Sequence, residues 1–149
     1  MSIGSARRGS EDHDMKTVEA SATTTASRDE VWRLIADEKQ WPAWGRWSSV
    51  EIEGGGVHGL GSVRRLVQRP FTVRELVTEW EPGSRMSYQL LDGMNAKGYT
   101  ATASLEDAPG GGTIVRWSSQ WDSADPITAF LLRTAAKDTV KRLAKAAVS

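Results

Sequence analysis

The sequence predicts an α+β domain in which seven mostly antiparallel strands pack against one long C-terminal helix, with two short helices after the first strand. The helix is indicated by residues 125–149, where apolar side chains recur every three or four positions. Asp125 is a suitable N-cap residue, and Pro126 suits the first helical position. The strands are indicated by short runs of alternating polarity that glycine and proline separate.

Composition limits the functions that the chain can have. Its 149 residues are expected to form one domain, and 19 basic against 19 acidic residues leave no excess charge for binding a nucleic acid. The lack of cysteine excludes disulfides and thiolate chemistry, and His13 and His58 are expected to be surface residues, so we expect neither a metal nor a cofactor. Because no apolar run is long enough to span a bilayer, we expect a soluble, cytoplasmic protein.

The N-terminal part predicts a tail, a strand and a helix. Residues 1–14 lack periodicity and few of them are apolar, so we expect a disordered extension before a domain at residues 15–149. Residues 16–25 alternate in polarity, as in a first strand. Ser27 and Glu30 have the spacing of a capping box, which predicts that a short helix begins there.

The middle of the chain predicts a broken helical turn and then strands. Pro42 and Gly45 interrupt residues 41–47, so a regular helix is not expected there. The remaining strands are predicted at residues 48–53, 62–68, 72–81, 85–92, 98–106 and 113–122. Residues 54–61 contain the pattern GxGxxG, but a dinucleotide fingerprint needs a helix after it, and a strand-like run follows here. We therefore interpret this segment as a flexible hairpin loop.

Alternation predicts which side chains face the C-terminal helix. The expected inward residues of the last three strands are Met86, Tyr88, Leu90, Tyr99, Ala101, Ala103, Leu105, Val115, Trp117, Ser119 and Trp121. Strand 72–81 is ambiguous, because Glu75 and Glu79 share one face with valines. On the helix, the expected sheet-facing residues are Leu132, Ala135, Ala136, Thr139, Val140, Leu143 and Ala147. The small residues among them either allow close packing or leave room for a ligand.

Several segments carry a resemblance to a known superfamily. They are VEASATTTASRDEVWRLIADEKQWPAW, VTEWEPGSRMSYQLL and GGTIVRWSSQWD, together with SSVEIEGGGVHGLGSVRRLV, which is similar to plant pollen-allergen relatives. The chain resembles the START-related (SRPBCC) superfamily and, within it, the bacterial polyketide cyclase/dehydrase-like branch. The resemblance implies a helix-grip fold, in which a curved antiparallel sheet wraps around the C-terminal helix. It also implies a cavity that takes a hydrophobic or aromatic small molecule, although the superfamily has no shared catalytic motif.

The resemblance also implies that Glu75, Val77 and Glu79 point into the cavity. A carboxylate held among aromatic rings without a partner is expected to have a raised pKa, which suits proton transfer near neutral pH. The alternative is that Glu75 pairs with Arg64 or Arg65 on the neighbouring strand, or lies at the solvent-filled mouth.

The first functional hypothesis is a module that binds a lipid-like or polyketide-like molecule, as a monomer or weak homodimer. Its expected ligand-binding residues are Trp47, Glu75, Val77, Tyr88, Tyr99, Ala101, Trp117, Ser119, Trp121, Leu131, Ala135 and Thr139. The second is a polyketide aromatase/cyclase-type enzyme, with Glu75, Tyr88 and Tyr99 as candidate catalytic residues.

A third hypothesis is a protein-interaction role, like that of co-chaperones with this fold. It needs an exposed apolar patch, for which Trp41, Pro42 and Trp44 are the candidates. A core filled completely by the seven tryptophans is a further alternative.

Overall fold

The computed structural model describes residues 16–55 and 57–149 and confirms the predicted α+β, helix-grip-like architecture. The predicted extension at 1–14 lies outside the described residues. The elements are β1 (Lys16–Thr24), α2 (Arg28–Ala36), η1 (Glu38–Gln40), α3 (Trp41–Trp44), β2 (Ser49–Ile52), η2 (Glu53–Gly55), β3 (Val63–Gln68), β4 (Phe71–Glu81), β5 (Arg85–Asp92), β6 (Ala96–Lys97), β7 (Thr100–Asp107), β8 (Thr113–Trp121), β9 (Ser123–Ala124) and α4 (Pro126–Ala146).

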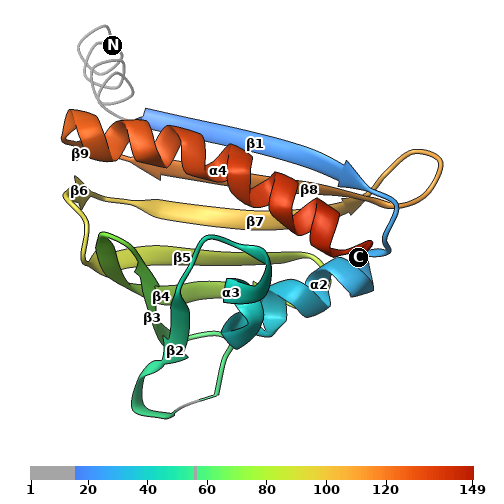
Figure 1. The fold of residues 1–149 in the computed structure, drawn as a ribbon, viewed down its shortest axis with the longest axis horizontal. Helices are drawn as coiled ribbons and strands as arrows, with labels where there is room; N and C mark the ends of the chain where they lie inside the picture. The colour runs from blue at the N-terminus through green and yellow to red at the C-terminus, as the bar shows by residue number, and fades with distance from the viewer. Residues whose placement is uncertain (1–15, 56) are drawn as a thin grey trace, which may run out of the picture.

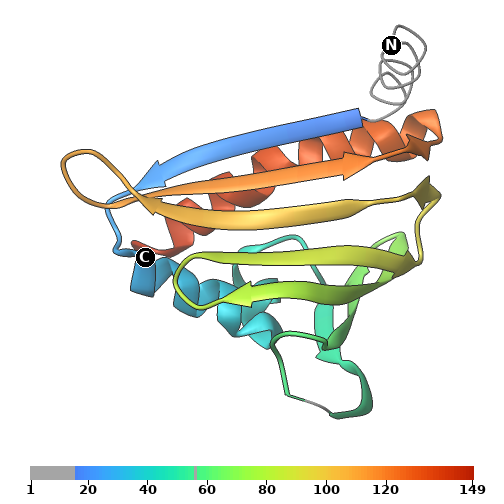
Figure 2. The same ribbon diagram turned by 180° about the vertical axis from the view of Figure 1, so that it is seen from behind.

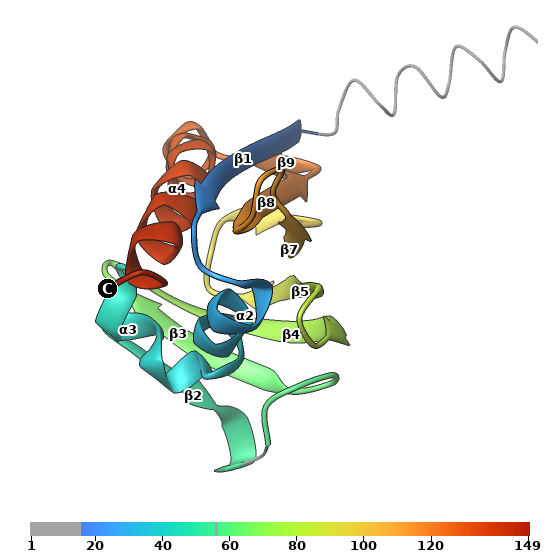
Figure 3. The ribbon, with the colours of Figure 1, turned by 90° about the vertical axis from the view of Figure 1, so that its right-hand side faces the viewer.

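Seven strands form one antiparallel sheet in the order β1-β8-β7-β5-β4-β3-β2. Helix α4 crosses one face of this sheet, and α2 and α3 lie on the same face (Figure 1). The view from behind shows the opposite face, on which the strands lie in front of the helices (Figure 2). Seen from the side, the sheet curves around the helices (Figure 3). The chain's interior is therefore the space between the concave face of the sheet and the helices.

Local signals set the ends of the two main helices as the sequence predicts. The Ser27 side chain accepts a hydrogen bond from the backbone N–H of Glu30, and the Glu30 side chain accepts one from the backbone N–H of Ser27. Asp125 caps α4 by accepting from the N–H of Thr128 at 2.8 Å. These three hydrogen bonds satisfy N–H groups that lack a partner inside the helix.

A β-bulge in β4 corrects the prediction for Glu79. Val77 pairs with Tyr88, but the next matched pair is Glu79 with Ser87, so the register shifts between them. Because one extra residue reverses the side to which the following side chains point, Glu75 and Val77 face the interior whereas Glu79 faces outward. Glu79 accepts a hydrogen bond from the Ser87 hydroxyl at 2.8 Å on that outer face.

The rotation of α4 about its own axis corrects the prediction of which α4 residues face the sheet. The buried residues of this helix are Thr128, Leu132, Ala136, Val140, Leu143 and Ala144. Ala135 and Leu131 are exposed, and Thr139 is half-buried. The helix packs mainly on β1 and β8, and this position turns the stripe of Leu132, Ala136 and Val140 toward the sheet. The expectation that Ala135 faces the sheet is therefore wrong.

A two-stranded sheet of β6 and β9 was not predicted. It pairs Ala96 with Ala124 and Lys97 with Ser123 just before α4 begins. Gly98 follows with a φ of 69°, a left-handed backbone conformation that favours glycine. Among the described helices, none is long and apolar enough to cross a membrane.

Candidate functional site

The most unusual feature of the interior is a buried arginine between two carboxylates. Arg64 on β3 has no exposed side-chain surface. Its Nε donates to Oε1 of Glu75 on β4 at 2.9 Å, and its Nη1 donates to Oε2 of Glu38 in η1. Its Nη2 lies 3.7 Å from the sulfur of Met86 on β5. Three strands and the connection between helices thus meet at one guanidinium group.

Aromatic rings hold the same guanidinium group on its faces. The Cζ atom of Arg64 lies 4.6 Å from the ring centroid of Trp41 and 4.5 Å from that of Tyr88. Cation–π contacts are made by the flat faces of a guanidinium group, and hydrogen bonds are donated from its edge. Both kinds of contact can therefore restrain Arg64 at once. We call Glu38, Arg64 and Glu75 the charge cluster.

Burial and pairing oppose each other in the charge cluster. Burial raises the pKa of Glu75, and the neighbouring Arg64 offsets only part of that shift. Burial alone would lower the pKa of Arg64, but Glu75 and Glu38 together raise it above its ordinary value. Arg64 is therefore always charged here, whereas Glu75 holds its proton more tightly than an exposed glutamate does.

Two buried polar atoms of the interior, one of them in the charge cluster, have no hydrogen-bond partner among the described residues. They are Oε1 of Glu38, an acceptor, and Nε1 of Trp44, a donor. Buried polar groups in proteins are usually hydrogen bonded, because leaving one without a partner costs about 1–3 kcal/mol. Each of these two atoms therefore has an unused hydrogen-bonding capacity in the interior.

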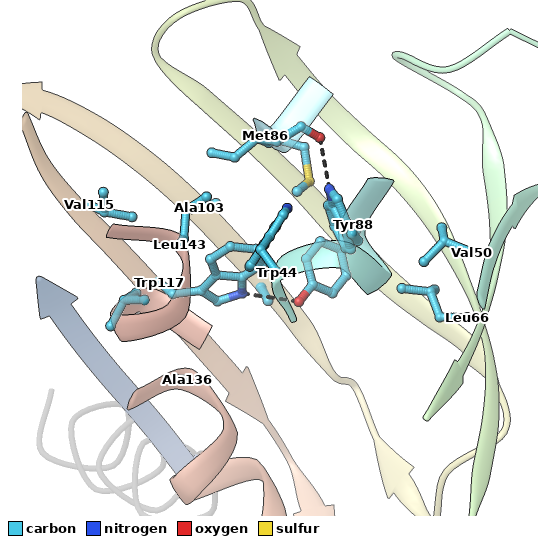
Figure 4. Packing of buried hydrophobic residues seen from close by; sticks show 14 of the residues in the cluster. Trp44, Val50, Leu66, Met86, Tyr88, Ala103, Val115, Trp117, Ala136 and Leu143 are labelled. Carbon is cyan, nitrogen blue, oxygen red and sulfur yellow. Dashed lines mark hydrogen bonds between the residues drawn. The ribbon is translucent and has the colours of Figure 1, made fainter. Parts of the chain in front are cut away.

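A ladder of aromatic side chains extends from the charge cluster toward the start of α4. Nε1 of Trp117 donates to the hydroxyl of Tyr88 at 3.1 Å, as the dashed line between them in Figure 4 shows. The rings of Tyr88 and Tyr99 lie 6.4 Å apart, and the Tyr99 ring stacks on that of Trp121 at the same separation. Burial raises the pKa of both tyrosines, so their hydroxyl groups stay protonated at neutral pH.

Most of the predicted ligand-binding residues come together at this place. Those buried at the interior face are Glu75, Val77, Tyr88, Tyr99, Ala101, Trp117, Ser119 and Trp121. Trp47 and Thr139 are half-buried, and Leu131 and Ala135 are exposed on α4. The predicted alternative that Glu75 pairs with Arg64 is confirmed. A role of these residues in binding stays a prediction.

Sequence reasoning missed Glu38 and the interior positions of Trp41 and Trp44. Glu38 is buried although a glutamate just after a short helix normally faces solvent, and no local pattern marks it. Trp41 and Trp44 are also buried, at 1% and 7% exposure. The expectation that they form an exposed apolar patch is wrong, because their rings pack against Arg64, Trp117 and Trp47 inside the domain.

Two open pockets lie at the surface of the described part of the chain. One, of about 450 Å³, lies at the start of α4 and is lined by Lys16, Trp121, Asp122, Ser123, Ala124, Ala129 and Arg133. The other, of about 460 Å³, lies beside α2 and is lined by Asp29, Trp32, Arg33, Ala36, Asp37 and His58. Trp121 belongs both to the first pocket and to the aromatic ladder. The first pocket, which we call the α4 pocket, therefore reaches the outer end of the ladder.

Two solved structures share this fold. The protein XoxI from Bacillus cereus matches with a TM-score of 0.73 and 20% sequence identity, over 91% of this chain and 96% of that protein. An uncharacterized protein from Bacillus thuringiensis matches with a TM-score of 0.75 and 20% identity, over 90% of this chain and all of that one (100%). At this identity the likeness concerns the fold alone. A search of curated proteins found no match.

The family described as "Polyketide cyclase / dehydrase and lipid transport" matches residues 15–149. That range includes every strand and helix described above. The chain therefore belongs to the polyketide cyclase/dehydrase and lipid transport family of the SRPBCC superfamily.

Proposed function

We propose that this protein binds a hydrophobic or aromatic small molecule that carries one polar end. The ligand enters by the α4 pocket, lies along the aromatic ladder and directs its polar end to the charge cluster. The observation that carries the proposal is Arg64, a fully buried guanidinium beside an unpaired carboxylate oxygen of Glu38. The family description, which names polyketide enzymes and lipid transport, supports a ligand of this class.

The stability of the folded protein does not by itself explain why the interior contains the charge cluster. Removing an ion from water into a protein interior costs several kcal/mol, and well-packed apolar residues often replace a buried ion pair without loss of stability. Ligand sites, in contrast, combine apolar walls with a few fixed polar groups that orient the ligand. Arg64 has this arrangement, because Trp41 and Tyr88 flank it and two carboxylates fix its position.

Ligand entry requires the aromatic ladder to move. Trp121 is 1% exposed and its ring lies against that of Tyr99, so the inner end of the α4 pocket is closed by side chains. Rotation of these two rings exposes the hydroxyl groups of Tyr99 and Tyr88 to the pocket. Binding is then accompanied by a change in tryptophan fluorescence, which gives a direct signal.

The second candidate function is that of an aromatase/cyclase-type enzyme, and Glu75 is the observation that favours it. Its raised pKa suits a group that takes a proton from an enolisable carbon and returns it to another site. Tyr88, with its hydroxyl kept protonated, is placed to donate a hydrogen bond to the carbonyl oxygen of such a substrate.

The test of ligand binding compares an interior change with a surface change on the same strand. The interior variant is Arg64→Met combined with Glu38→Gln and Glu75→Gln, which neutralises the cluster. The control is Arg65→Met, because Arg65 is exposed. The probe is an apolar fluorophore that carries a hydroxyl group, because a hydroxyl can donate to the unpaired oxygen of Glu38. Its affinity is expected to fall at least about tenfold, or about 1.4 kcal/mol, in the interior variant only. Equal binding by both variants and the wild type would refute this proposal.

Mass spectrometry of molecules released from natively purified protein then identifies the ligand class. The enzyme candidate is tested with Glu75→Gln and a model poly-β-ketone. An enzyme that uses this carboxylate loses turnover while it still binds the substrate, whereas a carrier changes only in affinity.

A further inference from the structure

The outward side of the first turns of α4 is apolar and exposed. Ile127 is 73% exposed, Phe130 64% and Leu131 37%. Their spacing of three and four residues places them together along one side of the helix. This side faces away from the sheet, since Leu132 and Ala136 occupy the buried stripe. Large apolar side chains exposed together on a folded domain usually mark a contact surface. We call these three residues the apolar patch.

Basic side chains continue the same side of α4 toward its C-terminus. Phe130, Thr134, Lys137, Lys141 and Lys145 follow each other at intervals of three or four residues, and all are exposed. Figure 1 shows that α4 runs the length of the domain as one continuous helix. One exposed strip of this helix is therefore apolar at its beginning and positively charged along the rest.

The acidic groups near this strip do not cancel its charge. Pro126–Ala146 contains five cations and one carboxylate, although the whole chain has a formal charge of zero. That carboxylate, Asp138, already pairs with Arg46 at 2.8 Å and with Arg142 at 2.9 Å. Asp125, just before the helix, is engaged as the N-cap of Thr128. Five cations against one carboxylate thus give α4 a net charge of +4.

We propose that α4 docks on the surface of an anionic phospholipid bilayer. The apolar patch inserts among the acyl chains near the headgroups, and Lys137, Lys141 and Lys145 contact the anionic headgroups. Charge complementarity favours this partner. An amphipathic helix with exposed large apolar and basic residues binds such surfaces by burying its apolar side chains and by electrostatic attraction to the anionic headgroups. A second copy of the chain fits less well, since its corresponding surface offers these lysines no free carboxylate.

Docking in this way brings the α4 pocket to the bilayer. Ala129 and Arg133 line that pocket and belong to the same turns of α4 as Phe130 and Leu131. The docking proposal rests on the surface of α4 and not on the proposed interior ligand. A protein without an interior ligand would still bind vesicles, so the two proposals are tested separately.

Vesicle co-sedimentation of the full chain tests the docking. The vesicles consist of phosphatidylcholine alone or of phosphatidylcholine with phosphatidylglycerol. Two double variants each remove one contribution to membrane binding. Ile127→Ser with Phe130→Ser removes the apolar side chains that insert, and Lys137→Glu with Lys141→Glu removes the positive charges that attract the headgroups. The matched control is Leu60→Ser, because Leu60 is 71% exposed in the connection between β2 and β3. Thermal unfolding checks that each variant folds, and light scattering gives its oligomeric state.

The wild type and Leu60→Ser are expected to bind anionic vesicles, and added salt is expected to weaken that binding. Each double variant is expected to lose at least about tenfold in partitioning, which corresponds to about 1.4 kcal/mol. The proposal is overturned if wild type does not bind anionic vesicles, or if folded double variants bind as well as wild type. It is also overturned if the wild type is a dimer that Ile127→Ser with Phe130→Ser makes monomeric, because the patch is then an interface between copies.

Discussion

Arg64 on β3 and Glu75 on β4 are register partners in neighbouring strands, and Nε of Arg64 donates to Oε1 of Glu75 at 2.9 Å in the buried interior. The pair therefore lies where the two strands already hold the side chains close together. Glu38 joins the pair from the connection between α2 and α3. The charge cluster thus fixes the position of that connection against the sheet.

Removing the cation alone is expected to destabilise the protein strongly. Arg64→Met leaves Glu38 and Glu75 buried without a positive partner, and breaking a buried ion pair from one side costs about 3–5 kcal/mol. The free energy of unfolding in urea measures this loss. The triple variant with Glu38→Gln and Glu75→Gln is expected to recover most of it. A single variant as stable as wild type would show that the cluster carries no buried charge.

The stability of the protein is expected to depend on pH through Glu75. Burial raises the pKa of Glu75 in the folded state above its ordinary value of 4.5, so folding favours the protonated form. The stabilisation that comes from holding this proton is complete below pH 4.5 and is lost as pH rises through the folded pKa. Lowering the pH from about 8 toward this range is therefore expected to stabilise wild type relative to Glu75→Gln. Denaturant unfolding of both proteins at each pH measures the difference, and a constant difference would contradict the prediction.

Two adjacent alanines of α4 are expected to respond differently to a large side chain. Ala136 is buried against the sheet, so Ala136→Trp overpacks a dense region and is expected to cost about 1–3 kcal/mol or more. Ala135 is exposed, and Ala135→Trp is expected to change the free energy of unfolding by less than about 0.5 kcal/mol. Thermal or urea unfolding of the two variants measures these costs. Equal costs would show that α4 is rotated from the position described here.

The bulge in β4 predicts opposite outcomes for two nearby residues. Val77 is 1% exposed, and Val77→Ala is expected to cost about 2 kcal/mol from lost burial and the remaining cavity. Glu79→Ala is expected to change stability by less than about 0.5 kcal/mol, because Glu79 lies on the outer face. Urea unfolding separates the two. A large loss in Glu79→Ala would place this carboxylate inside after all.

The N-terminal residues 1–14 are expected to be dispensable for folding, because they contain few apolar residues to bury. Deleting them and recording thermal unfolding is expected to leave the midpoint nearly unchanged. A fall of several degrees would show that this segment packs on the domain.

Features that depend on neighbouring residues in the sequence were the predictable part of this fold. The capping box at Ser27 and the cap at Asp125 depend on residues three positions apart, and the structure confirms both. The interior positions of Tyr88 and Trp117 follow from simple alternation along an uninterrupted strand. Such signals need no knowledge of what the segment packs against.

Features that depend on distant partners were not predictable. The bulge after Val77 is defined by how β4 pairs with β5. The resemblance turned Glu75 and Val77 inward, and regular alternation from them then placed Glu79 on the wrong face. The rotation of α4 depends on its packing against β1 and β8, and a difference of one position decides whether Ala135 or Ala136 is buried. Glu38 became part of the site only because tertiary packing brings it to Arg64.

The sheet order has a consequence for how the chain folds during synthesis. Strand β1 is synthesised before the other strands of the sheet, yet among the described strands it pairs with β8 alone, and Lys16 pairs with Trp121, which is 105 residues later. The hairpin of β3 and β4, which carries Arg64 and Glu75, is complete much earlier. A nascent chain therefore holds its first strand unpaired until β8 has been made, and such non-local pairing slows folding.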